Sequence, residues 1–264
     1  MKKKIIALVA LSGMATADAA VTLLPELLSN GGTANMTWLG GDPTNGYNVR
    51  GLTGKDSSQL TESIITSTFQ ADSTLTAEGW HATTGNKGSN NSYVVGTASQ
   101  NEVYVSATDS FRFNGRQAYN GELVLCSVDV SSLVNSNEEF VSAITLNFDM
   151  QAGSGGTVFT LWAWDGTNAT SLLKGASVNN IKLAADALSY NFSGTTTGNT
   201  IKVSGIELDT DESIIVVWGN SSTGSANIVS KLTSSATIAS IPEPTTATLS
   251  LLALAGLAAR RRRK

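Results

Sequence analysis

Two side chains that serve many active sites are almost missing from this sequence. Among its 264 residues there is one cysteine, Cys126, and one histidine, His81. A single cysteine excludes an intramolecular disulfide, and a single histidine excludes a multi-histidine metal site. Cys126 lies in an apolar run, where a small buried residue is expected, and nothing in the sequence places it beside His81. We therefore expect no cofactor and no thiol chemistry.

Basic residues are also scarce away from the two ends of the chain. Eight of the 17 lysines and arginines lie at residues 2–4 and 260–264. Between residues 20 and 240, nine basic side chains remain against nineteen acidic ones, a net charge of about −10, although the whole chain sums to −4. Such a segment has no basic surface for a phosphate backbone, so a nucleic-acid partner is excluded.

The start of the chain has the order of a secretory signal peptide. Lysines at residues 2–4 precede an apolar run at residues 5–11, and the small residues Ala15, Ala17 and Ala19 follow. Small residues at alternate positions fit the pocket of signal peptidase, which predicts cleavage after Ala17 or Ala19. A membrane anchor is the alternative, but the apolar run is well short of the ~20 residues that span a bilayer. We expect residues 1–19 to be removed during passage through the secretion machinery.

The end of the chain has a different three-part order. The triplet Pro242, Glu243 and Pro244 precedes the mostly apolar residues 245–259. A basic cluster closes the chain: Arg260, Arg261, Arg262, Arg263 and Lys264. The prolines favour extended backbone, which presents the triplet to a protease. The apolar run predicts a C-terminal transmembrane helix, and the arginines then stay on the cytoplasmic side. Because the run is somewhat shorter than a segment that fully spans the bilayer, it suits temporary retention of the protein in the membrane.

This order resembles the PEP-CTERM sorting domain in its Pro-Glu-Pro triplet, its Leu/Ala/Gly-rich residues 249–259 and its basic end. The resemblance implies that an exosortase, a membrane-embedded cysteine protease, cuts near the triplet and removes the tail. It also implies a Gram-negative type of envelope. A sortase substrate would need an LPxTG-like motif, and none precedes the apolar run. A plain tail anchor that keeps its C-terminal segment is the remaining alternative.

The middle of the chain is rich in Ser, Thr, Asn and Gly, which favours strands and turns over helices. Short apolar or alternating runs recur, with turn signals such as Asn-Gly and Asp165-Gly166 between them. The clearest strand is residues 144–150, where apolar and polar side chains alternate. Other strands are expected at residues 36–39, 64–69, 93–95, 103–105, 123–130, 158–164, 189–192, 201–203, 213–218 and 228–232. The pattern predicts an all-β fold, an antiparallel β-sandwich or jelly roll.

The chain therefore divides into four parts. A signal peptide covers residues 1–19, and a β-sandwich domain covers residues 20–232. Residues 233–241 are mostly small and polar, which predicts a linker that keeps the domain clear of the membrane. The sorting segment follows at residues 242–264.

Acidic side chains of the middle domain suggest two kinds of site, both weakly. Glycoside hydrolysis needs two facing carboxyl groups, but neighbours such as Glu138 and Glu139 point apart on a strand. Asp209, Asp211 and Glu212 lie close together and carry the oxygen ligands that calcium prefers, yet the EF-hand spacing is missing. We keep these three as weak calcium candidates and name no catalytic residue.

Tryptophan offers the best candidates for binding, because its ring stacks on the apolar face of sugars. Trp162 and Trp164 share one face of the expected strand by the two-residue period. Leu161 and Ala163 make the opposite face apolar as well, which favours a strand buried on both sides. A core role and a glycan-stacking platform are therefore both open for this pair, the core role being favoured.

The sequence predicts an exported, non-enzymatic protein of the cell envelope, cell surface or extracellular matrix. Its expected partners are signal peptidase, the exosortase, the inner membrane through a transient C-terminal helix and, by the family resemblance, extracellular polysaccharide. Two alternatives stay open. One is a carbohydrate-binding module that uses Trp162 or Trp164, and the other is an envelope glycoside hydrolase.

Overall fold

The computed structural model describes residues 19–28, 34–38, 60–82, 103–114, 123–153, 156–220 and 226–240. The signal peptide apart from Ala19, the expected strand at residues 93–95, and the sorting segment with Pro242, Glu243, Pro244 and the basic cluster lie outside these residues. Within them, none of the helices is long and apolar enough to cross a bilayer.

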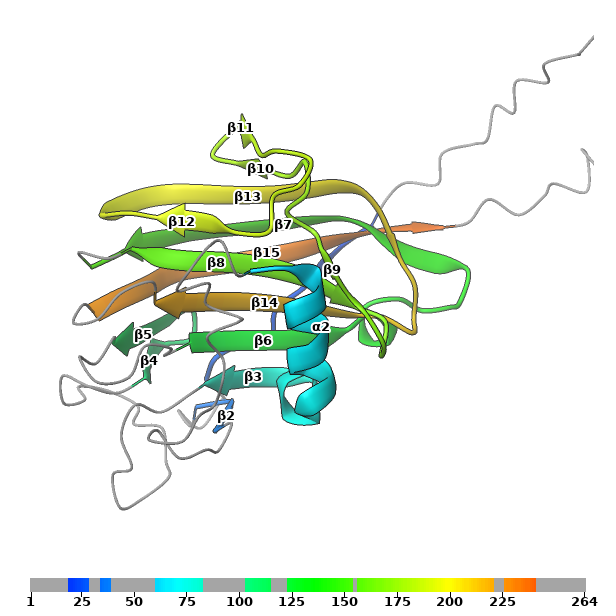
Figure 1. Ribbon diagram of the computed structural model, residues 1–264, viewed down its shortest axis with the longest axis horizontal. Helices are drawn as coiled ribbons and strands as arrows, with labels where there is room; N and C mark the ends of the chain where they lie inside the picture. Colours follow the sequence, from blue (N-terminus) through cyan, green and yellow to red (C-terminus); the bar gives the residue numbers. More distant parts are fainter. Residues whose placement is uncertain are drawn as a thin grey trace, which may run out of the picture.

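The described strands form two sheets that face each other (Figure 1). The large sheet has the strand order β11-β10-β13-β7-β15-β5-β4, and β1 also pairs with β15. Its strands are β1 (Ala19–Thr22), β4 (Tyr104–Ala107), β5 (Ser110–Asn114), β7 (Glu139–Gln151), β10 (Ser177–Val178), β11 (Ile181–Lys182), β13 (Thr195–Leu208) and β15 (Ala226–Ser240).

The small sheet has the order β12-β8-β14-β6-β3-β2, and β9 also pairs with β8. Its strands are β2 (Met36–Trp38), β3 (Gly79–Ala82), β6 (Leu123–Asp129), β8 (Thr157–Trp164), β9 (Ala169–Ser171), β12 (Tyr190–Phe192) and β14 (Ser213–Asn220). The pairing of β2 with β3 is parallel, and the other pairings between described strands are antiparallel. The expected antiparallel β-sandwich is confirmed.

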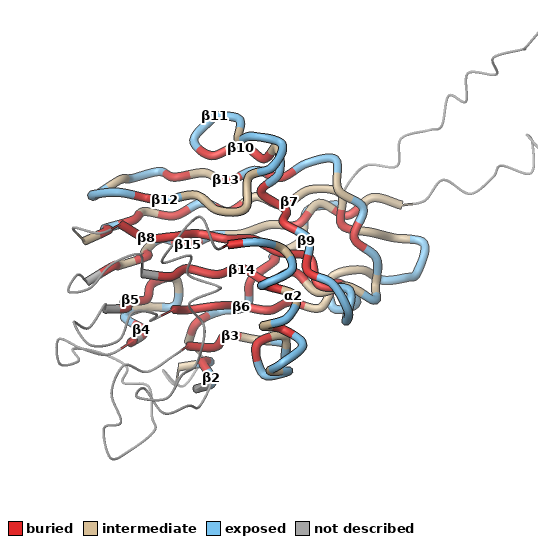
Figure 2. The backbone as a smooth tube through the Cα atoms, in the orientation of Figure 1, coloured by how far each residue is buried: buried red, intermediate tan, exposed pale blue. Residues whose placement is uncertain are grey.

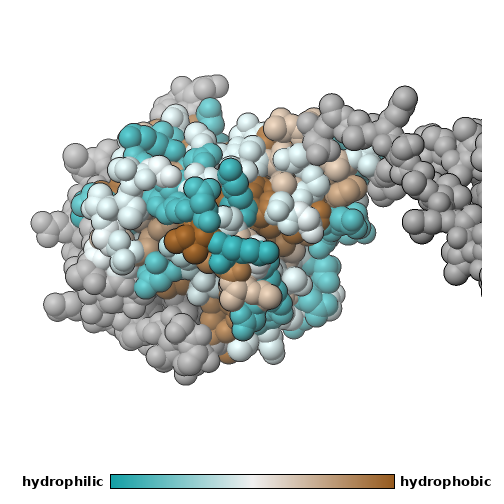
Figure 3. Space-filling model, turned by 90° about the horizontal axis from the view of Figure 1, so that it is seen from above, coloured by the Kyte–Doolittle hydropathy of each residue, from teal (hydrophilic) through white to brown (hydrophobic). Residues whose placement is uncertain are grey.

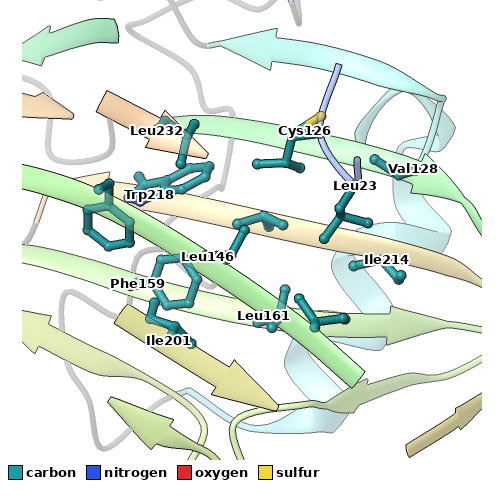
Figure 4. Close-up of a cluster of buried hydrophobic side chains, with 14 of the residues drawn as sticks. Leu23, Cys126, Val128, Leu146, Phe159, Leu161, Ile201, Ile214, Trp218 and Leu232 are labelled. Carbon is teal, nitrogen blue, oxygen red and sulfur yellow. The ribbon is translucent and has the colours of Figure 1, made fainter. Parts of the chain in front are cut away.

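The main core fills the space between the two sheets. On β7 the alternate residues Ile144, Leu146, Phe148 and Met150 are buried, as the period of two predicts. Figure 4 shows Leu146 in one cluster with side chains from both sheets, among them Trp218. Burying side chains of this size contributes ~1.5–3 kcal/mol each, so this interlayer contact is the main source of stability.

A second core lies on the other face of the small sheet, under the helix α2 (Glu62–Ala71) (Figures 1 and 2). We expected a strand at residues 64–69, and this prediction is wrong. Thr61 caps the helix, because its Oγ1 accepts a hydrogen bond from Ile64 N at 3.2 Å. Ile65 and Phe69, four residues apart, are buried on one side of the helix. A short apolar run is compatible with the two-residue period of a strand and with the 3.6-residue period of a helix. The cap at Thr61 favours the helix.

The linker predicted at residues 233–241 is also wrong up to residue 240, because β15 runs to Ser240. Thr233 and Thr237 face solvent at least in part, whereas Ala236 and Ile238 are buried. This alternation is that of a strand with one polar face. The segment is small and polar because it forms the outer side of the large sheet, which no helix among the described residues covers.

A bulge interrupts β15 between Ser230 and Thr233, where the pairing with β7 shifts register. Lys231 has a φ of 53° there, a left-handed conformation that is rare for residues other than glycine. Its ammonium group lies 2.7 Å from Asp149 Oδ2 on β7. The ion pair therefore joins the bulge to the neighbouring strand.

Replacing Phe69 with alanine is expected to destabilise the fold by about 3–5 kcal/mol, because a buried ring leaves a cavity against Trp164. Urea unfolding followed by tryptophan fluorescence measures the loss. The matched control is Ile64→Ala on the same helix, whose side chain is 37% exposed, with an expected loss below ~1 kcal/mol. Equal losses in the two variants would contradict the placement of α2.

Candidate functional site

Both ends of the described chain meet at one end of the sandwich, which we call the terminal end: β1, the last residues of β15 and the first residues of β7. Ala19 lies opposite Ile238, and Thr22 lies opposite Ser235. Figure 1 shows the start of β1 and the orange tip of β15 on the same side of the molecule. The expected signal-peptidase sites and the Pro242 triplet are thus adjacent in sequence to the same part of the fold.

The last residues of β15 are fixed on both sides. β7 pairs with them up to Ser240, which lies opposite Glu139. Ser142 Oγ donates a hydrogen bond of 3.1 Å to the carbonyl oxygen of Thr237. On the other side Leu24 N donates to Ser234 Oγ at 2.8 Å. The sheet therefore holds the chain until two residues before Pro242.

The three calcium candidates lie in one tight turn between β13 and β14. Glu212 N donates to Asp209 O at 3.0 Å, and Asp209 N donates to Glu212 Oε2 at 2.8 Å. Burial raises the pKa of Glu212, the bond from Asp209 N opposes this, and the charges of Asp209 and Asp165 add to the rise. Among the described residues, no group of three His, Cys, Asp or Glu side chains is arranged to hold a metal ion. The carboxylate of Glu212 thus closes a turn by binding the backbone of Asp209.

Asp165 closes the expected turn between β8 and β9 in a similar way. Its Oδ1 accepts hydrogen bonds from Thr167 N at 2.7 Å and Asn168 N at 2.6 Å. These N–H groups lower its pKa. A raised and a lowered carboxyl pKa side by side is a pattern that glycosidases use. Here the carboxylates of Asp165 and Glu212 are each hydrogen-bonded within their own turn, so backbone closure accounts for them without catalysis.

The tryptophan pair is part of the second core. Trp162 is fully buried, and its Nε1 donates to Thr160 Oγ1 at 2.8 Å. Trp164 is 8% exposed and stands edge-on to Phe69, with ring centroids 5.5 Å apart. A stacking platform needs an exposed ring face, so the platform prediction is wrong and the core role is confirmed.

Cys126 and His81 do not form a pair. Trp80 lies opposite Cys126 on the neighbouring strand, so His81 points to the other face of the small sheet. Burial raises the pKa of the Cys126 thiol and lowers the pKa of His81. The ring Nε2 of His81 lies 2.8 Å from Ala77 O. Both side chains have the environments of core residues.

The outer side of the large sheet carries hydroxyl and amide groups in rows across β13, β7 and β15, and we call it the hydroxyl face. In one row Thr200 Oγ1 donates to Asn147 Oδ1 at 3.0 Å, and Asn147 Nδ2 donates to Thr233 Oγ1 at 3.4 Å. The next row is Lys202, Thr145 and Ser235. No described helix covers this face, unlike the outer side of the small sheet. Because residues 233–241 were predicted to be a linker, this surface was not expected. The alternation of polar and apolar side chains along residues 233–238 could have indicated a strand there.

Large hydrophobic side chains reach the described surface rarely. Ile181 is 61% exposed and Ile64 is 37% exposed. Figure 3 looks onto the edge with β10 and β11, where most of the described surface is hydrophilic or near neutral. The described residues thus offer polar surfaces for contact rather than an apolar patch.

Residues 240–264 match the family described as the PEP-CTERM protein-sorting motif. The resemblance noted in the sequence is confirmed, and the motif indicates an exported, exosortase-processed envelope protein. The match covers the C-terminal segment alone and assigns no family to the sandwich. No curated protein matches the chain.

The similar solved structures are distant. One is the enzymatically active domain of tailspike protein 4 of bacteriophage CBA120, 13% identical over 54% of this chain and 18% of that chain, with a TM-score of 0.34. Another is TmCBM61 in complex with beta-1,4-galactotriose, 12% identical over 50% of this chain and 72% of that chain, with a TM-score of 0.29. Scores this low support no conclusion about function.

Replacing Glu212 with glutamine tests the turn. A carboxyl whose pKa is raised by folding adds stability below its usual value of 4.5, and this stability is lost as the pH rises through the folded-state pKa. We therefore expect the free energy of unfolding of E212Q to exceed that of the wild type by less than ~1 kcal/mol near pH 7. In acid, where Glu212 is protonated in both states, the two free energies should be equal.

Urea unfolding at several pH values measures the difference, with Asp211→Asn in the same turn as the control. A calcium-dependent rise in wild-type stability that E212Q lacks would instead establish the calcium site.

Proposed function

We propose that this protein is a non-enzymatic cargo of exosortase sorting. The sandwich is exported behind a signal peptide, held briefly at the inner membrane by its C-terminal helix, and released into the envelope or extracellular matrix when the tail is cut near Pro242, Glu243 and Pro244. The observation that carries the proposal is the terminal end. There the described part of β15 reaches Ser240, two residues before Pro242 in the sequence.

The absence of catalysis in this proposal is supported by the partners of the described reactive side chains. Cys126 is buried in the main core, and His81 lies against Ala77 O. The carboxylate of Glu62 binds Lys174 Nζ at 2.7 Å and accepts Ser171 N at 2.8 Å, which joins α2 to the strand beneath it. The Cys126 thiol and the Glu62 carboxylate thus have structural roles, and this supports the proposal.

Extracellular polysaccharide is the proposed partner, and the hydroxyl face is the proposed surface. Polysaccharides present many neutral donors and acceptors, and the row through Asn147 presents the same chemistry at the strand spacing of ~4.8 Å. The next row adds the hydroxyls of Thr145 and Ser235 beside the ammonium group of Lys202. The net charge of the middle segment is strongly negative, so a neutral polymer fits this protein better than an anionic one. Binding without an aromatic platform follows from the burial of Trp162 and Trp164.

The first test is the intact mass of the protein recovered from its native host, with and without a functional exosortase. We expect the mature protein to lack both the signal peptide and the residues after about Pro242, and the strain without the enzyme to retain the tail. If the tail remains in both strains, the protein is tail-anchored and the proposal fails. An intact signal peptide in the mature protein would contradict the part of the proposal that concerns export behind a cleaved signal.

The second test is co-sedimentation of the mature protein with polysaccharide isolated from the host. Asn147→Lys places a long charged side chain in the centre of the hydroxyl face, and we expect it to weaken retention at least about fivefold, or ~1 kcal/mol. Ser63→Lys adds the same charge on the exposed side of α2 and is expected to bind like the wild type. Equal retention of all three proteins would remove the hydroxyl face as the binding surface.

A further inference from the structure

A protease must take hold of the backbone on both sides of the bond that it cuts. It does so with hydrogen bonds to backbone N–H and C=O groups in an extended segment, and a strand enclosed by two neighbours leaves no room for the enzyme beside it. The relevant question at the terminal end is therefore how near the sheet comes to the triplet. The described part of β15 ends at Ser240, and Ile241 is the one residue between it and Pro242 in the sequence.

The residues on the sheet side of this point are well held. Residues 235–237 have residues 20–22 of β1 on one side and β7 on the other. Ile238 pairs with Ala19, a contact that the mature protein keeps only if signal peptidase cuts after Ala17. Ala239 and Ser240 pair with Phe140 and Glu139 of β7. The bond from Ser142 Oγ to Thr237 O adds to this ladder, and Ile238 is only 6% exposed. Residues 235–237 are thus held from both sides, whereas Ala239 and Ser240 have a described strand partner on the β7 side alone.

The distance to the apolar segment is short as well. From Ser240 to Thr245 there are five residue steps, and a fully extended chain spans at most ~3.6 Å per residue. The described end of the sheet therefore lies within roughly 18 Å of the first residue of that segment. A protease working at the membrane meets the folded domain directly beside its cleavage site.

We propose that the terminal end controls exosortase processing: β1, β7 and Ser142 hold the end of β15, and the tail is cut when the last residues of this strand fray. Cleavage of a transiently opened segment follows the population of the open form when opening and closing are fast. Residues 235–240 are thus positioning residues that set the rate, and the mature domain keeps β15 whole. This inference rests on the proposed exosortase processing.

The experiment uses the full chain in the host with an inducible exosortase, followed by pulse–chase and intact mass. One variant inserts Gly-Ser-Gly-Ser between Ser240 and Ile241, which supplies unpaired backbone before the triplet without touching the fold. The matched control inserts the same four residues between Pro244 and Thr245, which lengthens the tether to the membrane but leaves the triplet beside the strand.

We expect the upstream insertion to raise the first-order rate of tail removal about tenfold, equivalent to ~1.4 kcal/mol, the size of one or two backbone hydrogen bonds. The downstream insertion should not raise it. If both insertions speed tail removal equally, the length of chain between the domain and the membrane limits the reaction. If neither changes the rate, opening of the end of β15 does not limit it. Either outcome overturns the proposal.

A pair of point variants tests the same idea from within the fold. Ser142→Ala removes the donor to Thr237 O and is expected to speed tail removal by about two- to fivefold. Ser67→Ala removes a comparable donor, to the carbonyl oxygen of Ser63 on α2 at 2.9 Å, and should leave the rate unchanged. If S142A and the wild type lose the tail at equal rates, the hydrogen bond from β7 to Thr237 does not limit processing. Failure of tail removal in the wild type would refute the exosortase proposal instead, so the two failures are distinguishable.

Discussion

The long antiparallel ladder between β7 and β15 is the contact on which the rest of the structure depends. It runs from Ile228 opposite Gln151 to Ser240 opposite Glu139, in the centre of the large sheet. The inner side of these two strands supplies nine of the 38 buried residues of the main core, and their outer side carries much of the hydroxyl face. β1, β5 and β13 are attached to it in turn. Because the two strands are far apart in sequence, the fold depends on a non-local pairing.

The sequence predicted the parts of this fold whose side-chain pattern is local and strong. The alternation along residues 144–150 gave β7, and the apolar residues on both sides of Trp162 indicated a strand buried on both faces. α2 was missed because Ile65 and Phe69 fit either period over so short a run. The end of β15 was missed because Ser and Thr are common to linkers and to exposed strand faces. Only its neighbours in the sheet decide between the two.

For the candidate site, the sequence located the sorting triplet but not its setting. The order of motif, apolar run and basic end is linear information, so Pro242, Glu243 and Pro244 could be identified without a structure. That a strand holds the chain up to Ser240, and that β1 lies beside it, depends on pairing between distant segments. The calcium candidates failed for a similar reason, since Glu212 is drawn to Asp209 N by a turn whose shape the composition does not reveal.

The place of β15 in the sheet has a consequence for the order of folding. It is the last described strand along the chain, yet it lies between β7 and β5 in the large sheet. Until residues 226–240 are in place, no described strand joins β4 and β5 to β7. Closing the large sheet, and with it the main core, is therefore a late and non-local step.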